Sequence, residues 1–102
     1  MVKLLILDKN ERFNIDKNTE TFAEIVKKFR EEYIELTEAL NKGTDIDHIV
    51  EEALDVLQLS VNLVDRLSCK DMSLEKHINL HNLKLIGRGW EIKREFEVKQ
   101  IQ

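Results

Sequence analysis

The sequence predicts an all-α fold, in which three main helices form a bundle that oligomerisation completes. The chain of 102 residues is expected to be one domain, and with no proline and only three glycines it contains little that interrupts a helix. Apolar residues recur at helical spacing through residues 22–40 and again through residues 46–64. The second of these segments is apolar on two sides, which indicates a helix that is packed by neighbours all round.

The first helix has clear start and stop signals. Thr21 followed three residues later by Glu24 forms a capping box, which predicts that the helix begins directly after Thr21. The apolar periodicity ends at Leu40, so the helix should end near Asn41. Gly43 lies just beyond and is typical of a helix C-terminal stop.

Similar signals bound two further helices. Thr44, Asp45 and Asp47 offer N-caps for a second helix that runs to about Leu67. Ser73 or Asp71 would cap a third, which should reach about Ile86 before Gly87. The terminal segments allow short β-strands, because residues 2–7 are apolar and residues 95–101 alternate between apolar and polar side chains.

Composition narrows the classes of function. The net charge of −4 argues against a nucleic-acid-binding surface, which would show a basic excess. Cys69 is the only cysteine, so the chain cannot form an intrachain disulfide and a reducing compartment fits best. The longest apolar run contains Asp55 and Asn62, which excludes a membrane span, and no signal peptide is visible. A soluble cytoplasmic protein is expected.

Four acidic side chains are predicted to meet on the first two helices. Glu32 and Glu35 lie three residues apart in the first helix, and Glu52 and Asp55 do so in the second. Residues three apart point to the same side of a helix. Because only a short loop joins the two helices, the two pairs should come close to each other in an antiparallel hairpin.

These carboxylates need a counter-charge. Glu52 falls in angle between Leu59 and Leu63, so Glu52 and Asp55 are expected to face protein rather than water, and no lysine or arginine lies within residues 46–63. Repulsion among four such groups costs on the order of several kcal/mol unless a cation neutralises them. Oxygen ligands favour Mg²⁺ or Mn²⁺ over zinc. The alternative interpretation is two ordinary solvated helix faces.

The complete pattern resembles the signature of a known enzyme family. Glu-x-x-Glu in "EEYIELTEAL", then sixteen residues, then Glu-x-x-Asp in "EEALDVL" is similar to the motif of the MazG-like all-α nucleotide pyrophosphohydrolases. The likeness covers about residues 20–90, and the closing segment "HNLKLIGRGW" is also similar to that of small members of the group.

The resemblance implies a reaction and a metal. Members of that family cleave a nucleoside triphosphate to the monophosphate and pyrophosphate, with Mg²⁺ bound by four acids. Carried over to this chain, the ligands are Glu32, Glu35, Glu52 and Asp55. Glu35 or Glu32 would also serve as the general base for the attacking water. The expected role is a Mg²⁺-dependent, or Mn²⁺-dependent, hydrolase in nucleotide-pool sanitation.

Three residues near the end of the third helix are candidate substrate contacts. The resemblance implies that Asn82 would take the position of the family's substrate-binding asparagine. Lys84 and Arg88 are natural partners of phosphate oxygens. The alternative for these two basic residues is that they complement the dipole at the helix C-terminus.

A hypothesis from a different class is a non-catalytic helical oligomerisation or regulatory module that keeps the fold. Two apolar stripes on one helix exceed what three helices of one chain can cover. Both hypotheses therefore predict a homodimer or homotetramer, without nucleic acid or membrane partners. The acidic residues distinguish the enzyme hypothesis from the interaction-module hypothesis, since a pure interaction module has no reason to keep carboxylates between Leu59 and Leu63.

Overall fold

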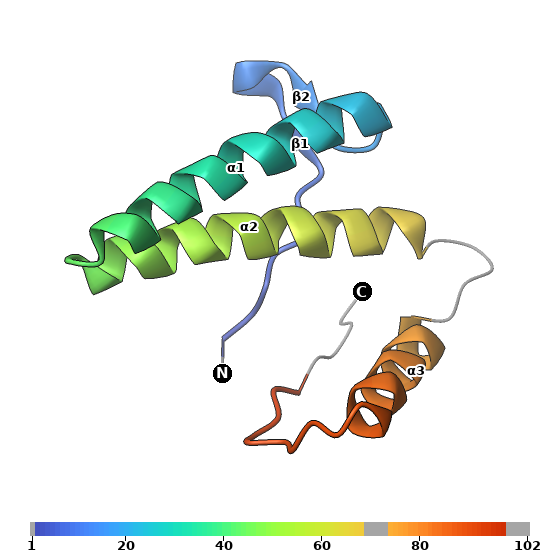
Figure 1. Cartoon of the computed structure of the whole chain (residues 1–102). Coiled ribbons are helices and arrows are strands. Elements are labelled where there is room, and N and C mark those ends of the chain that lie inside the picture. The colour runs from blue at the N-terminus through green and yellow to red at the C-terminus, as the bar shows by residue number, and fades with distance from the viewer. Residues whose placement is uncertain (1, 69–73, 98–102) are drawn as a thin grey trace. The chain divides into compact units, whose positions relative to one another are not determined.

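The computed structural model describes residues 2–68 and 74–97. In chain order these contain β1 (Lys9–Asn10), the short 3-10 helix η1 (Glu11–Phe13), β2 (Ile15–Asp16), α1 (Phe22–Lys42), α2 (Ile46–Leu67) and α3 (Leu74–Gly87). The predominantly helical class is confirmed, and β1 and β2 form a small antiparallel ribbon (Figure 1). Two compact units make up the chain, Met1–Lys70 and Asp71–Gln102.

The α1–α2 hairpin of the first unit begins and ends where the local sequence predicts. The hydroxyl of Thr21 accepts a hydrogen bond from the Glu24 backbone N–H at 3.1 Å, which caps α1. Gly43 ends this helix with a φ of 63°, a left-handed conformation that glycine adopts without strain. The Asp45 carboxylate accepts from the His48 N–H at 3.1 Å and caps α2. The two helices then lie side by side and antiparallel (Figure 1).

The strand predicted for residues 2–7 is wrong. This segment has no regular structure, and side chains of α2 hold its backbone instead. The Leu7 N–H donates to Oδ1 of Asn62 at 3.0 Å, and the Gln58 amide donates to the Leu5 carbonyl. Since α2 satisfies these polar groups, they need no second strand as a partner.

The ribbon that does form lies immediately downstream and was not predicted. Lys9 pairs with Asp16 and Asn10 with Ile15. Asn14 makes the reversal possible with a φ of 54°, in the left-handed region that asparagine tolerates better than most residues. The ribbon leads directly into the N-terminus of α1.

The second unit contains α3 and the extended segment that follows it. The helix ends at Gly87, one residue beyond the end predicted near Ile86, and Gly89 follows with a φ of 88°. The predicted caps Asp71 and Ser73 lie outside the described residues, as does the end of the predicted C-terminal strand. Residues 95–97, which are described, have no regular structure, so the strand prediction is wrong for this part.

Burial within a single chain is slight. Of the described residues only Ala39 and Glu32 are buried, and large apolar side chains such as Ile46 and Leu54 on α2 are exposed. Within the first unit, α1 and the N-terminal segment cover only part of the circumference of α2, so the expectation that α2 is packed all round is not met inside that unit. None of the described helices has the length and apolar character needed to span a membrane.

Candidate metal centre

Four carboxylates from the two helices of the hairpin converge, as the sequence predicts. One oxygen from each of Glu32, Glu35, Glu52 and Asp55 can be chosen so that all four lie within 4.8 Å of one another. Glu32 and Glu35 come from α1 and the other two from α2. The three-residue spacing places each pair on one side of its helix, and the antiparallel hairpin brings the two sides together. We call these four residues the acidic cluster.

The acidic cluster has a buried side and an open side. Glu32 is only 8% exposed, and the side chain of Glu52 is 14% exposed. Glu35 and Asp55 are exposed. The expectation that Asp55 faces protein is thus wrong for the single chain, because the cluster opens to solvent on the side where Asp55 and Glu35 lie. An ion or ligand can therefore approach Glu35 and Asp55 from solvent.

Two of the buried oxygens have no partner. Oε2 of Glu32 and Oε2 of Glu52 are inaccessible to solvent and accept no hydrogen bond from any described residue. Burying a carboxylate oxygen without a donor or a cation is costly. A hard divalent cation supplies what is missing, because such ions prefer oxygen ligands. The donor set and its unpaired oxygens therefore fit Mg²⁺ or Mn²⁺.

The other oxygens of the same two carboxylates are paired with residues that sequence analysis missed. Nζ of Lys28 lies 3.2 Å from Oε1 of Glu32, and Nε2 of His48 lies 3.8 Å from Oε1 of Glu52. Each pair is spaced four residues apart on one helix, which is a recognised signal for ion pairing. That signal was available in the sequence. The Lys28 ammonium compensates part of the negative charge of Glu32, and neither contact involves Oε2 of either glutamate.

Charge within the acidic cluster shifts the titration of two groups. The negative charge of Glu32 is the main cause that raises the pKa of Glu35 above its ordinary value, and Glu52 adds to the effect. The hydrogen bond to Glu32 raises the pKa of Lys28. Glu35 therefore holds a proton more tightly than an isolated glutamate does, which is a property expected of a general base.

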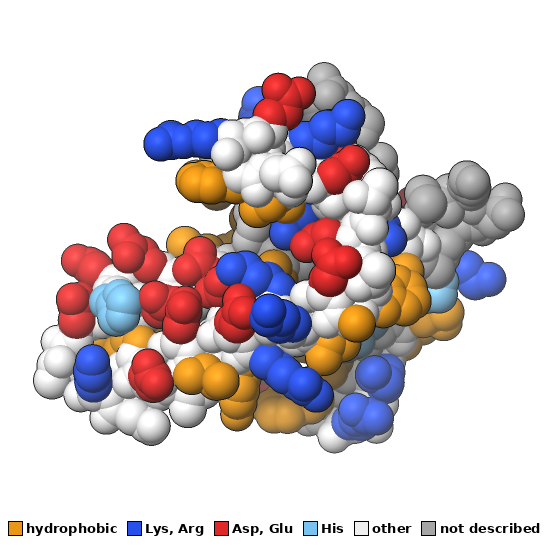
Figure 2. All heavy atoms as spheres, turned by 90° about the horizontal axis from the view of Figure 1, so that it is seen from above, with side chains coloured by type: hydrophobic (Ala, Val, Ile, Leu, Met, Phe, Trp, Pro, Cys, Tyr) orange, Lys and Arg blue, Asp and Glu red, His pale blue; other side chains and the backbone are white. Residues whose placement is uncertain are grey.

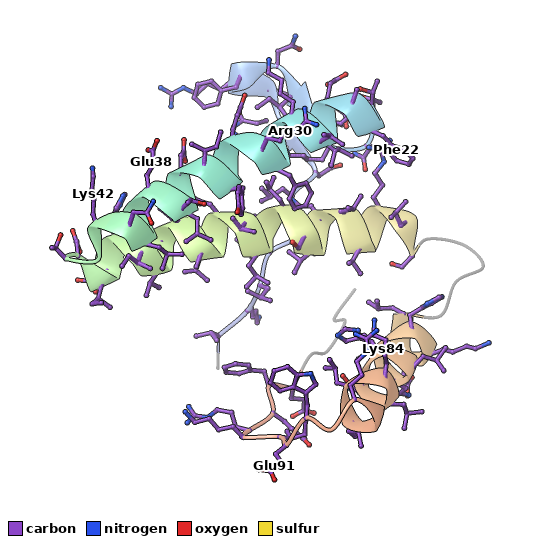
Figure 3. The ribbon with its side chains drawn as sticks, viewed as in Figure 1. Phe22, Arg30, Glu38, Lys42, Lys84 and Glu91 are labelled. Atoms are coloured by element: carbon purple, nitrogen blue, oxygen red, sulfur yellow. The ribbon has the colours of Figure 1, made fainter. Side chains whose placement is uncertain are left out.

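Acidic side chains are concentrated near the α1–α2 turn. Figure 2 shows Asp and Glu side chains gathered with a histidine toward that end of the visible face. Not every acid in this region belongs to the acidic cluster. Glu38 lies on the side of α1 away from α2, close to Lys42 (Figure 3). It is exposed.

The three predicted substrate contacts belong to the second unit, whereas all four carboxylates belong to the first. Asn82 and Lys84 are exposed on α3, and Arg88 is exposed directly after it. The Arg88 N–H donates to the Lys84 carbonyl at 3.1 Å and so extends the helical hydrogen bonding past Gly87. Their role in substrate binding stays a prediction.

Comparison with known proteins adds no independent assignment. No family model matches the chain, and searches of curated proteins and of solved structures find no significant match. The case for a function therefore depends on the side chains themselves and on the motif in which they occur.

Proposed function

We propose that the protein is a Mg²⁺-dependent nucleoside triphosphate pyrophosphohydrolase that acts in nucleotide-pool sanitation in the cytoplasm. It would convert a ribonucleoside or deoxyribonucleoside triphosphate to the monophosphate and pyrophosphate. The observation that carries the proposal is the acidic cluster, in which two buried oxygens lack partners. The resemblance of its spacing to the MazG-like motif supports the choice of reaction.

The four acids divide naturally into two roles. Glu32 is buried and Glu52 is half-buried; their Oε1 atoms lie near Lys28 and His48, and the two residues would form a fixed inner part of the metal site. Glu35 and Asp55 are exposed and would meet the ion and the substrate from the solvent side. Bound among these oxygens, Mg²⁺ or Mn²⁺ would neutralise phosphate charge and lower the pKa of an attacking water.

Glu35 is the best placed general base. Its carboxylate is exposed on the solvent side of the acidic cluster, so it can accept the proton of a water that attacks the α phosphorus. The new bond joins that water oxygen to the α phosphorus, and the bond from the α phosphorus to the bridging oxygen breaks. Pyrophosphate then leaves with the electron pair of that bond. Glu32 is the alternative base, but its burial and its contact with Lys28 favour a fixed role.

Product analysis tests this proposal most directly. The purified chain would be incubated with a panel of ribonucleoside and deoxyribonucleoside triphosphates and Mg²⁺, and the products separated by ion exchange. We expect monophosphate and pyrophosphate in equal amounts. Diphosphate with orthophosphate would indicate attack at the γ phosphorus and contradict the proposal. Glu38→Gln is the matched control, since Glu38 is exposed on α1 outside the acidic cluster.

A second candidate function is favoured by the exposed apolar surface of the hairpin. Val26, Phe29, Arg30, Tyr33 and Val56 line a shallow apolar depression of about 450 Å³. Tyr33 is 67% exposed, and Leu40, further along α1, is 57% exposed. We propose that a second copy of the chain covers this surface in a homodimer or homotetramer. If no nucleotide is hydrolysed, oligomerisation through this surface becomes the better account of the protein.

A further inference from the structure

Lys28 brings a positive charge to the edge of the acidic cluster. Its Nζ lies 3.2 Å from Oε1 of Glu32, which is one helical turn further along α1, and 3.7 Å from Oε2 of Glu31. The side chain of Lys28 is 46% exposed, so a ligand can approach it from solvent. The unpartnered Oε2 that fits a metal belongs to the same Glu32 carboxylate. A ligand of that metal would therefore lie next to the Lys28 ammonium.

The ammonium of Lys28 has the capacity for a further contact. A lysine carries three N–H donors and no acceptor at the end of a flexible stem. Glu32 takes one of these donors, whereas Glu31, at 3.7 Å, lies beyond the usual hydrogen-bond distance. A divalent cation that shares the charge of Glu32 would weaken the attraction between this carboxylate and the ammonium. A phosphate oxygen, which carries a negative charge, is then a suitable partner for Lys28.

Further basic side chains lie on the same side of the acidic cluster as Lys28. Lys17 and Arg66 line a small hollow between α1 and α2 together with Lys28. Both contact Glu20, Lys17 through an ion pair of 3.3 Å and Arg66 through a hydrogen bond to the Glu20 carbonyl. Toward the α1–α2 turn, in contrast, acidic side chains are concentrated and would repel a polyphosphate (Figure 2). This distribution of charge favours the phosphate end of a nucleotide on the side of Lys28.

We infer that Lys28 is a substrate contact, which binds the β- and γ-phosphates of the nucleotide, the part that leaves as pyrophosphate. The inference rests on the proposed function and deepens it, because it assigns the two ends of the nucleotide to two sides of the acidic cluster. When the bond from the α phosphorus to the bridging oxygen breaks, its electron pair stays on that oxygen, which belongs to the leaving β-phosphate. The ammonium faces this added negative charge and gives up no proton. Lys28 thus stabilises the leaving group as well as binding it.

Three variants separate the charge of Lys28 from its contact with Glu32. Lys28→Gln keeps an N–H donor at this position and removes the charge, whereas Lys28→Arg keeps both. Lys27→Gln removes a charge from the neighbouring exposed position on α1 and is the matched control. Thermal melting of each variant shows that it folds. The rise of Tm with Mg²⁺ in the absence of nucleotide shows that its metal site is intact.

Binding is measured by calorimetry in excess Mg²⁺ with three kinds of ligand: α,β-imido analogues of a panel of nucleoside triphosphates, inorganic pyrophosphate, and the nucleoside monophosphates. We expect Lys28→Gln to raise the Kd of the analogues and of pyrophosphate by about ten- to a hundredfold, the effect of one lost charge-assisted hydrogen bond. The Kd of the monophosphates should not change. Lys28→Arg should restore tight binding because it keeps the charge, and Lys27→Gln should match the wild type.

Four results would overturn the inference, and they are distinguishable from one another. If the wild-type chain hydrolyses nucleotides and Lys28→Gln binds the analogues and pyrophosphate equally well, Lys28 contacts no phosphate and the proposed function stands. If Lys28→Gln weakens Mg²⁺ binding without nucleotide as much as it weakens nucleotide binding, Lys28 acts only by orienting Glu32. If it weakens binding of the monophosphates alone, the nucleotide lies in the opposite orientation. If the folded wild-type chain binds no nucleotide in Mg²⁺, the proposed function fails, and the contact fails with it.

Discussion

Lys28 contacts only one oxygen of the Glu32 carboxylate. Its Nζ lies 3.2 Å from Oε1, whereas Oε2 is buried and accepts no hydrogen bond from the described residues. Glu52 repeats this arrangement on α2, where His48 lies near Oε1 and Oε2 is unpaired. The protein thus fixes one side of each buried carboxylate and leaves the other side available. Such a division is expected of metal ligands that are oriented by neighbouring residues.

The first prediction is that Mg²⁺ or Mn²⁺ stabilises the folded chain. The cation binds the folded acidic cluster and not the unfolded chain, so stability should rise with its concentration, by about 2.7 kcal/mol at a hundred times Kd. Differential scanning fluorimetry at increasing millimolar concentrations measures this as a rise in Tm. Asp55→Ala should lose the rise. A wild-type Tm that neither metal changes would contradict the metal site.

The second prediction concerns the roles of Glu35 and Asp55 in turnover. Glu35→Gln removes the proposed base and should lower kcat by about 10²–10⁴-fold, the usual contribution of a general base. Asp55→Ala should abolish metal-dependent activity and leave the metal-free Tm unchanged or higher, because it relieves repulsion among the acids. Steady-state kinetics measures the two losses of activity and thermal melting in EDTA measures the metal-free Tm, with Glu38→Gln as the control in both. Near-normal kcat in Glu35→Gln would transfer the role of base to another residue.

The third prediction is the pH dependence of stability without metal. The folded-state pKa of Glu35 is raised above 4.5, chiefly by the charge of Glu32. Its contribution to stability is therefore fully present below the unfolded-state pKa and is lost as the pH rises through the folded-state pKa. The Tm of the wild type relative to Glu35→Gln should fall over this interval, as measured by melting in EDTA.

Bound metal should reverse the sign of the pH dependence of Tm. Carboxylate ligands must lose their protons to bind a cation, so the rise in Tm caused by Mg²⁺ should grow with pH. For the metal-free experiment, one outcome would contradict the prediction. If the difference in Tm between the wild type and Glu35→Gln in EDTA is the same at every pH, the acids do not interact in solution.

The fourth prediction is that the chain is an oligomer in solution. Size-exclusion chromatography with light scattering should give the mass of a dimer or tetramer at micromolar concentration. Tyr33→Glu places a charge in the apolar depression and should shift the mass toward the monomer, because burying that charge is costly. Lys27→Glu, at an exposed position on the same helix, should have no such effect. A wild-type monomer would exclude this arrangement.

Much of the fold could be predicted because its determinants are local. Thr21, Gly43 and Asp45 end or begin helices through contacts within a few residues, and each lies where the sequence indicates. Convergence of the acidic cluster was also predictable, since residue spacing and a short loop are sufficient to bring Glu32 and Glu52 together. The contacts of Lys28 with Glu32 and of His48 with Glu52 were missed, although their four-residue spacing was visible in the sequence.

What the sequence determined by itself is the set of helices and the side of each helix that carries the acids, because both follow from interactions between near neighbours along the chain. Only the tertiary structure decided that residues 2–7 remain irregular, since their backbone groups find partners on α2 that lie more than fifty residues away. It likewise decided which oxygens are buried and which are exposed. Burial depends on how two helices approach in space, and periodicity along one helix does not contain that information.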